Sequence, residues 1–169
     1  QTHLDSGLGL EVLVQGQSPK RQLMTRFREG DSLGQGGCIL VASASFWEGF
    51  DVPGDALQLV VIDKLPFAPP DDPVVEARGA RLQQQGRSVF MELALPEAAV
   101  TLKQGAGRLI RSESDRGILV VCDERLSSKG YGARLLSAMP PMRRLTGRDE
   151  FRQALGALQP ESPELPPGL

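Results

Sequence analysis

Four short runs of hydrophobic residues punctuate the chain, with helical patterns between them. The runs are rich in Val, Ile and Leu, do not alternate with polar residues, and cover residues 11–15, 38–42, 57–63 and 117–122. Such runs are typical of strands in a parallel sheet that is covered on both faces. Apolar residues at helical spacing predict helices over 18–28, 72–85, 96–111 and 131–138. Because strand and helix alternate, we expect an α/β fold with right-handed crossovers.

Prolines and a capping residue mark several ends of these elements. Ser18 is a candidate cap with Pro19 at the first helical position, and Pro140 and Pro141 end the last predicted helix. The stretch 156–169 holds four prolines and no periodic apolar face. We therefore predict one domain over residues 1–155, followed by a flexible, proline-rich tail over 156–169.

The length and composition suit a single globular domain, with 169 residues of which 40% are hydrophobic and 24% charged. No run approaches the roughly 18 consecutive apolar residues of a membrane span, and the first residues lack both parts of a signal peptide. We expect a cytoplasmic protein without membrane contact. The chain lacks an initiating Met and begins in what resembles the end of a helix, so we expect a piece of a longer polypeptide.

Charge and the reactive side chains reduce the number of function classes that suit this chain. A net charge of −2 gives no global basic field for nucleic acid, so any such contact must come from local patches. Of the 19 basic residues 15 are Arg, which suits bidentate phosphate contacts, although a GC-rich genome explains the bias equally well.

Cys38 and Cys122 sit in apolar runs and are expected to be buried in a reducing compartment. His3 is the single histidine, which argues against a His-based zinc site and against a Ser/His/Asp triad. We expect no metal-ligating residues in this chain.

One predicted helix carries an amide and two guanidinium groups on one side. Gln104, Arg108 and Arg111 fall within about 60° of arc at helical spacing. The opposite side is apolar and consists of Ala99, Leu102, Ala106, Leu109 and Ile110. Gly105 and Gly107 should each cost about 1 kcal/mol relative to alanine, which suggests close approach of a ligand or another backbone. The polar side is either an anion-facing stripe or a solvated helix face.

The chain has no phosphate-binding loop of its own. A P-loop needs the pattern G-x-x-x-x-G-K-[ST], and no lysine of this chain follows a glycine. The glycine-rich run 34–37 precedes a strand instead of linking a strand to a helix, so it predicts a hairpin-like or loose connection. An arginine-bearing helix without a cradle suggests a domain that supplies arginine fingers to a nucleotide held elsewhere.

Ligands of open parallel sheets bind beyond the carboxyl ends of the strands, which directs attention to the loops 43–55, 64–72 and 123–130. The first loop contains Trp47, Glu48 and Asp51 directly after a strand. These residues either form part of a site, or Trp47 plugs the top of the core and the two carboxylates cap a turn.

Several segments in register resemble one helicase family. The run from Gln104 to Arg111 resembles helicase motif VI, Q-x-x-G-R-x-x-R, in the Q-G-x-G-R-L-I-R form of the DinG/YoaA branch of the XPD-like superfamily-two helicases. The run Ser-Phe-Trp-Glu-Gly-Phe-Asp-Val-Pro-Gly at 45–54 resembles motif V of the same branch. The runs 60–73, 123–126 and 129–132 follow the order of this family as well. The resemblance covers the chain from about residue 11 to 145.

The resemblance implies a RecA-like fold of the P-loop NTPase type, as the second motor domain of an ATP-dependent DNA helicase of bacteria. Such an enzyme moves 5′ to 3′ along single-stranded DNA in repair or replication, and a first RecA-like domain holds ATP with Mg²⁺. The resemblance places Gln104, Arg108 and Arg111 at the ATP phosphates, either arginine being the finger. It also implies a nucleotide side at Glu48, Gly49, Asp51 and Gly107, and DNA phosphate near Ser43 and Ser45.

Other parts of the family pattern have no counterpart in these residues. The Walker A and B motifs, the four cysteines of an iron–sulfur cluster, the arch insertion and the first strand of the second domain, which carries motif IV, are missing. We therefore expect this chain to be inactive alone, with any iron–sulfur cluster in the longer polypeptide, and the sheet to be exposed at one position. Two alternatives stay open. One is a binding module that docks to a replication or repair partner through Arg143, Arg144, Arg148 and the tail, and the other is the motor domain of a DinG-like nuclease.

Overall fold

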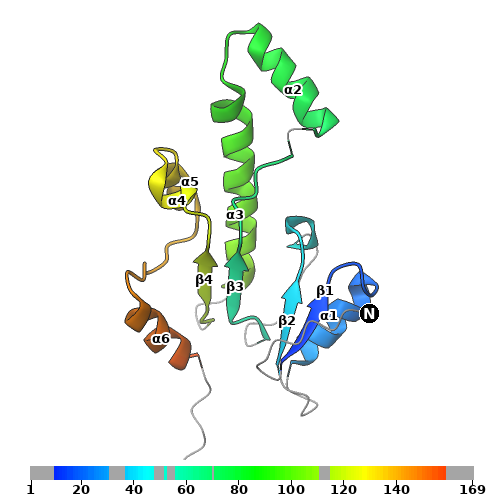
Figure 1. Cartoon of the computed structure of the whole chain (residues 1–169), viewed down its shortest axis with the longest axis vertical. Coiled ribbons are helices and arrows are strands. Elements are labelled where there is room, and N and C mark those ends of the chain that lie inside the picture. The colour runs from blue at the N-terminus through cyan, green and yellow to red at the C-terminus, as the bar shows by residue number, and fades with distance from the viewer. Residues whose placement is uncertain are drawn as a thin grey trace, which may run out of the picture.

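The computed structural model describes residues 10–30, 37–47, 52, 56–69, 71–110 and 115–158. Strands and helices alternate along the chain, as predicted for an α/β fold (Figure 1). The elements in order are β1 (Glu11–Val14), α1 (Lys20–Glu29), β2 (Cys38–Val41), the 3₁₀ turn η1 (Ala44–Trp47), β3 (Leu59–Ile62), α2 (Pro73–Gln84), the π-helical turn η3 (Phe90–Ala94), α3 (Leu95–Leu109), β4 (Ile118–Val121), α4 (Arg125–Ser128), α5 (Gly132–Ala138) and α6 (Arg148–Gly156).

The strands of the described residues pair as two separate parallel ribbons. β1 pairs with β2, with Glu11 opposite Cys38, and β3 pairs with β4, with Leu59 opposite Ile118. All four arrows point the same way, in the spatial order β4, β3, β2, β1 (Figure 1). The single parallel sheet that the sequence predicts is therefore interrupted between β2 and β3.

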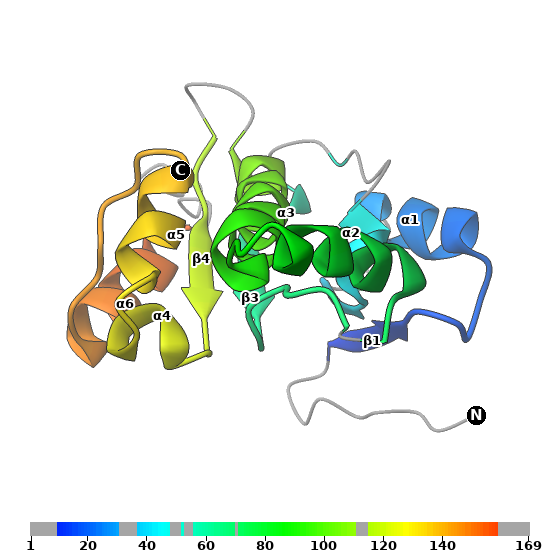
Figure 2. The same cartoon turned by 90° about the horizontal axis from the view of Figure 1, so that it is seen from above.

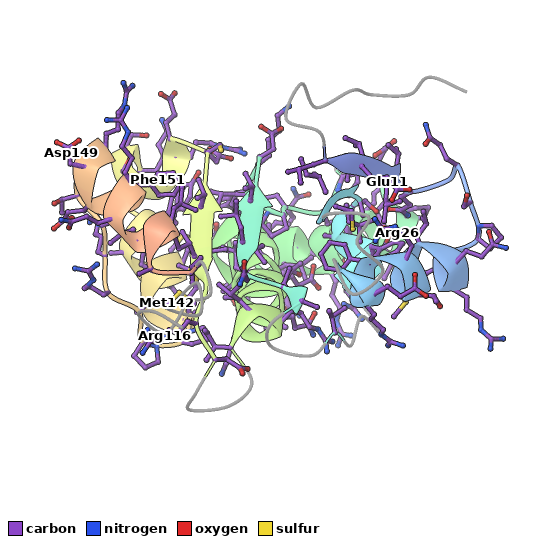
Figure 3. All side chains as sticks on the ribbon, turned by 90° about the horizontal axis from the view of Figure 1, so that it is seen from below. Glu11, Arg26, Arg116, Met142, Asp149 and Phe151 are labelled. Atoms are coloured by element: carbon purple, nitrogen blue, oxygen red, sulfur yellow. The ribbon has the colours of Figure 1, made fainter. Side chains whose placement is uncertain are left out.

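One face of both ribbons is covered by α1 and α3 (Figure 2). Leu23 and Phe27 of α1 share a buried cluster with Leu13 of β1 and with Leu109, the last residue of α3. A second cluster lies under the amino-terminal half of α3 and consists of Ile62, Leu65, Leu95, Ala98, Leu102 and Leu135. An ion pair of 2.6 Å between Arg26 Nε and Glu11 Oε2 closes the outer end of this layer (Figure 3). The core is thus continuous across the interruption on this face.

The starts of α2 and α1 compare differently with the predictions from the sequence. α2 lies within the predicted range 72–85 and begins after Asp72, whose carboxylate accepts hydrogen bonds from Val74 N (2.8 Å) and Val75 N (3.2 Å). The predicted cap at Ser18 is wrong, because α1 begins at Lys20 without a side-chain cap. Ser18 instead forms an isolated bridge with Gln15 that keeps it in the extended approach to the helix.

The structure also contains helices that the sequence analysis missed. The short α4 follows β4, and α6 occupies part of the stretch after the two prolines. α6 is fixed at its start by Glu150, whose carboxylate accepts from the Thr146 N–H (2.7 Å) and hydroxyl (3.1 Å). At its end, Gln58 Nε2 donates to Leu158 O over 3.1 Å. Asp149 and Phe151 mark α6 beside β4, at the flank away from α1 (Figure 3).

The two cysteines differ in how far they are exposed to solvent. Cys38 is half-buried in β2, and burial raises the pKa of its thiol. Cys122 is exposed, so its predicted burial is wrong, because it lies one residue past the end of β4 at Val121. Over the described ranges, no group of three His, Cys, Asp or Glu side chains could hold a metal ion. No described helix is long and apolar enough to cross a bilayer.

Candidate functional site

The polar stripe predicted on one helix falls on the last turns of α3. Gln104 is exposed and Arg108 is half-buried, whereas Leu102, Ala106 and Leu109 are buried against the core. Arg111 lies outside the described residues. Ile110 does not belong to the apolar side as predicted, because α3 ends at Leu109 and Ile110 has extended backbone (φ −123°) and is exposed. The described part of the stripe is therefore one amide and one guanidinium.

Arg108 lies at the amino ends of β3 and β4, not at the carboxyl ends. α3 runs antiparallel to the strands, since its first residue packs with Leu65 after β3 and its last residue packs with Leu57 ahead of β3. A Cβ added to Gly117, immediately ahead of β4, would overlap the Leu109 side chain and lie 3.1 Å from Gln58 O. The loops at the carboxyl ends, to which the strand rule directed attention, are thus at the other edge from Arg108.

Val52 ties the segment after β2 to this end of α3. Its side chain is 0% exposed and belongs to the same buried cluster as Leu109 and Phe46. Phe46, the neighbour of Trp47, is buried in this cluster. The side chain of Trp47, which the sequence analysis considered as a plug of the core, lies outside the part that the structure describes. Glu48, Gly49 and Asp51 lie outside the described residues. The chain therefore runs from the carboxyl end of β2 to a buried anchor beside the end of α3.

Ser43 and Ser45 form a small polar network with a residue that the sequence analysis missed. Gln15 Oε1, after β1, accepts hydrogen bonds from Ser43 N (2.8 Å) and Ser43 Oγ (3.0 Å). The Ser43 and Ser45 hydroxyl oxygens are 2.8 Å apart. Because Ser43 gives its proton to Gln15, Ser45 donates to Ser43. The only sequence signal for Gln15 was its position, as the polar residue that ends the first predicted strand run, 11–15.

Asp123 and Arg125 form a second polar group at the carboxyl ends of β3 and β4. The Asp123 carboxylate accepts from Leu65 N (2.9 Å) and from Arg125 Nη2 (2.6 Å), and its side chain is only 6% exposed. The guanidinium of Arg125 also lies 5.4 Å above the Phe67 ring. These hydrogen bonds, Arg125 first, hold the pKa of Asp123 far below its ordinary value. Asp123 and Arg125 thus clip the chain that leaves β3 to the chain that leaves β4.

The clip makes an acid-dependent contribution to stability. The carboxylate is charged in the folded and unfolded states above about pH 4, so its stabilisation is complete there. As the pH falls below about 4, the unfolded chain takes up the proton first, and this stabilisation is lost. We expect Asp123→Asn to lower Tm most at pH 7, and progressively less as the pH falls from about 4 toward 2. Thermal unfolding across this range is the measurement, with Asp149→Asn, at an exposed carboxylate, as control. A Tm deficit that is constant with pH would contradict the assignment.

Comparison with known proteins shows the family to which the chain belongs. The chain matches the family model described as the helicase C-terminal domain over residues 1–142. The ATP-dependent DNA helicase YoaA of Escherichia coli (strain K12) is 52% identical over 132 residues, which are 78% of this chain and 20% of that protein. The ATP-dependent helicase DinG of Mycobacterium tuberculosis (strain ATCC 25618 / H37Rv) is 38% identical over 151 residues, 89% of this chain and 22% of that protein.

A third relative carries a different activity in its name. The 3'-5' exonuclease DinG of Bacillus subtilis (strain 168) is 39% identical over 141 residues, 82% of this chain and 14% of that protein. The chain thus spans no more than about a fifth of the length of these curated relatives.

Proposed function

Because this chain belongs to the helicase C-terminal domain family and is similar to YoaA and DinG, we propose that it is the second motor domain of an ATP-dependent DNA helicase. The longer polypeptide of which it would be part is called the parent below. In the parent, this domain would close on a first RecA-like domain in the bacterial cytoplasm and move single-stranded DNA in the 5′ to 3′ direction. The relatives compared are bacterial, which supports this setting.

The nucleotide side is proposed at the amino-terminal edge of the strands. ATP with Mg²⁺, when bound to the first domain, supplies the phosphoryl group for hydrolysis. Gln104 and Arg108 would meet its phosphates, with Gly107 of the same helix, Arg111, and the residues Glu48, Gly49 and Asp51 of the segment after β2 beside them. The described residues fit such a supplementary role, since they offer a guanidinium and an amide but no phosphate cradle. Arg108 would stabilise charge on the transferred group and Gln104 would orient it.

The DNA side is proposed at the opposite edge, around Ser43 and Ser45. A backbone N–H can only donate, so the Gln15 atom that accepts from Ser43 N is Oε1, and the Nε2 group keeps two donors. Both serine protons are used within the network. The Gln15 amide is therefore the donor that can meet a phosphate oxygen without breaking a hydrogen bond. Contacts to the backbone suit a motor that moves along any sequence.

One observation supports coupling between the nucleotide side and the DNA side. The segment that starts at Ser43 on the DNA side has Val52 buried in one cluster with Leu109, next to Arg108. Nucleotide-driven closure at Arg108 would therefore displace the same segment that holds the DNA-side hydroxyls. This arrangement supports a role for motif V, the run 45–54, in linking ATP binding and hydrolysis to the affinity for DNA.

The proposal predicts strand separation by the parent and none by this chain alone. We expect the parent with ATP to unwind a duplex that carries a 5′ single-stranded tail and to leave a 3′-tailed duplex intact. Native gels of labelled duplexes measure both. Equal unwinding of the two substrates would contradict the direction, and no DNA-stimulated ATP hydrolysis by the parent would contradict the motor.

Removal of the DNA-side donor should weaken DNA binding selectively. We expect Gln15→Ala in the parent to weaken single-stranded DNA binding about tenfold, because it removes the amide donors and also the acceptor that holds Ser43 in place. Affinity for ATP without DNA should not change. Fluorescence anisotropy with a labelled oligonucleotide measures the effect, and Gln17→Ala, an exposed glutamine two residues on, is the matched control. Equal DNA affinity of both variants would remove the DNA assignment at this edge.

A nuclease parent is the second candidate, favoured by the name of the Bacillus subtilis relative. In that case the same motor domain would serve an exonuclease elsewhere in the parent. Degradation of 3′-labelled DNA by the parent decides between the two candidates. The alternative of a docking module is unsupported by the comparisons, although Arg143, Arg144 and Arg148 are exposed. It predicts partner capture by the peptide 139–169.

A further inference from the structure

Three aromatic side chains meet beyond the carboxyl ends of β3 and β4. Phe67 comes from the chain that leaves β3, Phe90 from the π-helical turn ahead of α3, and Tyr131 from the start of α5. The ring centroid of Phe90 lies 5.6 Å from that of Phe67 and 5.0 Å from that of Tyr131, and the latter two are 6.0 Å apart. Each ring therefore contacts the other two, although the residues are far apart in the sequence.

The three rings differ in how deeply they are buried. Phe67 and Tyr131 are half-buried and pack against the buried cluster under the amino-terminal half of α3. Phe90 rests on these two rings and is itself 37% exposed. Its ring is inclined by 38° to Phe67 and by 61° to Tyr131, so neither neighbour is stacked parallel on it. Phe90 thus keeps ring surface that a flat group can cover.

The backbone that carries Phe90 is fixed at both ends of its turn. Ser88 Oγ accepts a hydrogen bond from Met91 N (3.3 Å), and Ser88 O accepts one from Glu92 N (3.0 Å). At the other end, Leu95 N donates to Phe90 O across the π-helical turn. Such turns are wider than α-helical ones and are frequent at functional sites. The ring is therefore presented by a backbone whose hydrogen bonds are made.

Two ion pairs flank the rings. The guanidinium of Arg125, which lies 5.4 Å above the Phe67 ring, is paired with Asp123. Arg87, ahead of the π-helical turn, is paired with Glu92 within it. Charges that are already paired attract a phosphate less than free ones do, so the rings are the principal feature that this surface offers a ligand. Exposed ring surface suits a flat, uncharged ring system, which it binds by stacking.

The rings lie on the same edge of the strands as the proposed DNA side. All four strands point the same way, and α4 and α5 lie beyond the end of β4 (Figure 1). Gln15 and Ser43 follow β1 and β2, whereas Phe67 and Tyr131 follow β3 and β4. A DNA strand that crosses this edge from β1 toward β4 would therefore pass from the polar network to the rings.

We propose that Phe90, supported by Phe67 and Tyr131, is a stacking platform for an unpaired base of single-stranded DNA. The polar network around Gln15 holds the sugar-phosphate backbone, and the platform holds a base further along the same strand. Every base has a flat π face, so stacking on a ring is compatible with movement along any sequence. The platform rests on the proposed function, since only a protein that binds single-stranded DNA presents unpaired bases to it.

Two oligonucleotides of equal length test the platform. A thymidine oligonucleotide and an abasic oligonucleotide carry the same phosphates, but only the first offers bases. In the parent, Phe90→Leu keeps an apolar side chain and removes the ring. We expect it to weaken binding of the thymidine oligonucleotide about tenfold and to change binding of the abasic one less than about twofold. Fluorescence anisotropy with labelled oligonucleotides measures both affinities.

Two further variants make the measurement specific to the ring. Met91→Ala shortens the neighbouring side chain, which is 40% exposed against 37% for Phe90. It should leave the affinity for both oligonucleotides unchanged, because Met91 has no ring to stack. Phe90→Tyr keeps a ring and should bind the thymidine oligonucleotide as tightly as the unsubstituted parent does.

The outcomes separate the platform from the proposed function. An equal loss of affinity for both oligonucleotides in Phe90→Leu overturns the platform, because the ring would then support the fold and not a base. Unchanged affinity of Phe90→Leu for the thymidine oligonucleotide overturns it as well, and leaves the motor intact. Equal affinity of the unsubstituted parent for the two oligonucleotides overturns the platform without any variant. If the unsubstituted parent binds neither oligonucleotide, the proposed function fails and the platform fails with it.

Discussion

Replacing Arg108 with alanine is expected to reduce ATP turnover by the parent on the order of a thousandfold, with little change in KM for ATP. Arg108 is half-buried at the end of α3, where Leu109 fixes the helix against Val52 and Gly117. A guanidinium held in this way can meet charge that develops on the transferred phosphoryl group. Loss of an interaction made only in the transition state lowers kcat more than it changes substrate binding.

Three companions make the Arg108 measurement specific. Lys103→Ala removes a cation from an exposed position on the same helix and should leave turnover unchanged. Arg108→Lys should recover only part of the rate, because lysine keeps the charge but not the planar pair of donors. Arg111→Ala decides which arginine is the finger, by the larger loss. Near-normal DNA-stimulated turnover by both alanine variants would end the assignment of α3 to the nucleotide.

Gly132→Ala is expected to cost about 3 kcal/mol of folding free energy, which corresponds to a fall in Tm of about 6 to 12 °C. Gly132 opens α5 beneath α4, and a Cβ at this position would overlap the carbonyl oxygen of Leu126 and lie 2.7 Å from its carbonyl carbon. Both atoms are backbone, so no side-chain rotation relieves the clash and α4 must move. Movement of α4 would also disturb the adjoining Asp123 and Arg125 clip.

Gly130 provides the matched control for Gly132. It lies two residues earlier, and a Cβ there would meet nothing within 4 Å. Gly130→Ala should therefore change Tm by less than about 2 °C. Urea or thermal unfolding of the two variants side by side is the measurement. Similar stability of the two would show that the contact of α4 with α5 is looser than described.

Local patterns predicted the elements well, because they depend on neighbouring residues. The strands lie within the predicted apolar runs, and α2 lies within the helix predicted over 72–85. The motif resemblance was confirmed at the level of the family. The residue roles that it implied at Gln104, Arg108, Ser43 and Ser45 stay predictions. Sequence alone was thus sufficient for the fold class and the family.

Features that depend on distant contacts were not predicted. The edge at which Arg108 lies follows from the direction of α3 relative to the strands, which no local spacing encodes. Val52 reads as part of a loop, yet it is buried because Leu109 and Phe46, far apart in the sequence, meet there. Gln15 carries no motif, and its role becomes visible only when β1 and β2 pair and bring it to Ser43.

The hydrogen bond from Gln58 Nε2 to Leu158 O joins residues that are 100 positions apart in the sequence. During synthesis on the ribosome this contact can form only after residue 158 has emerged, which makes α6 the last of the described elements to dock. The elements from β1 to α5 can therefore pack before the chain that follows them is complete.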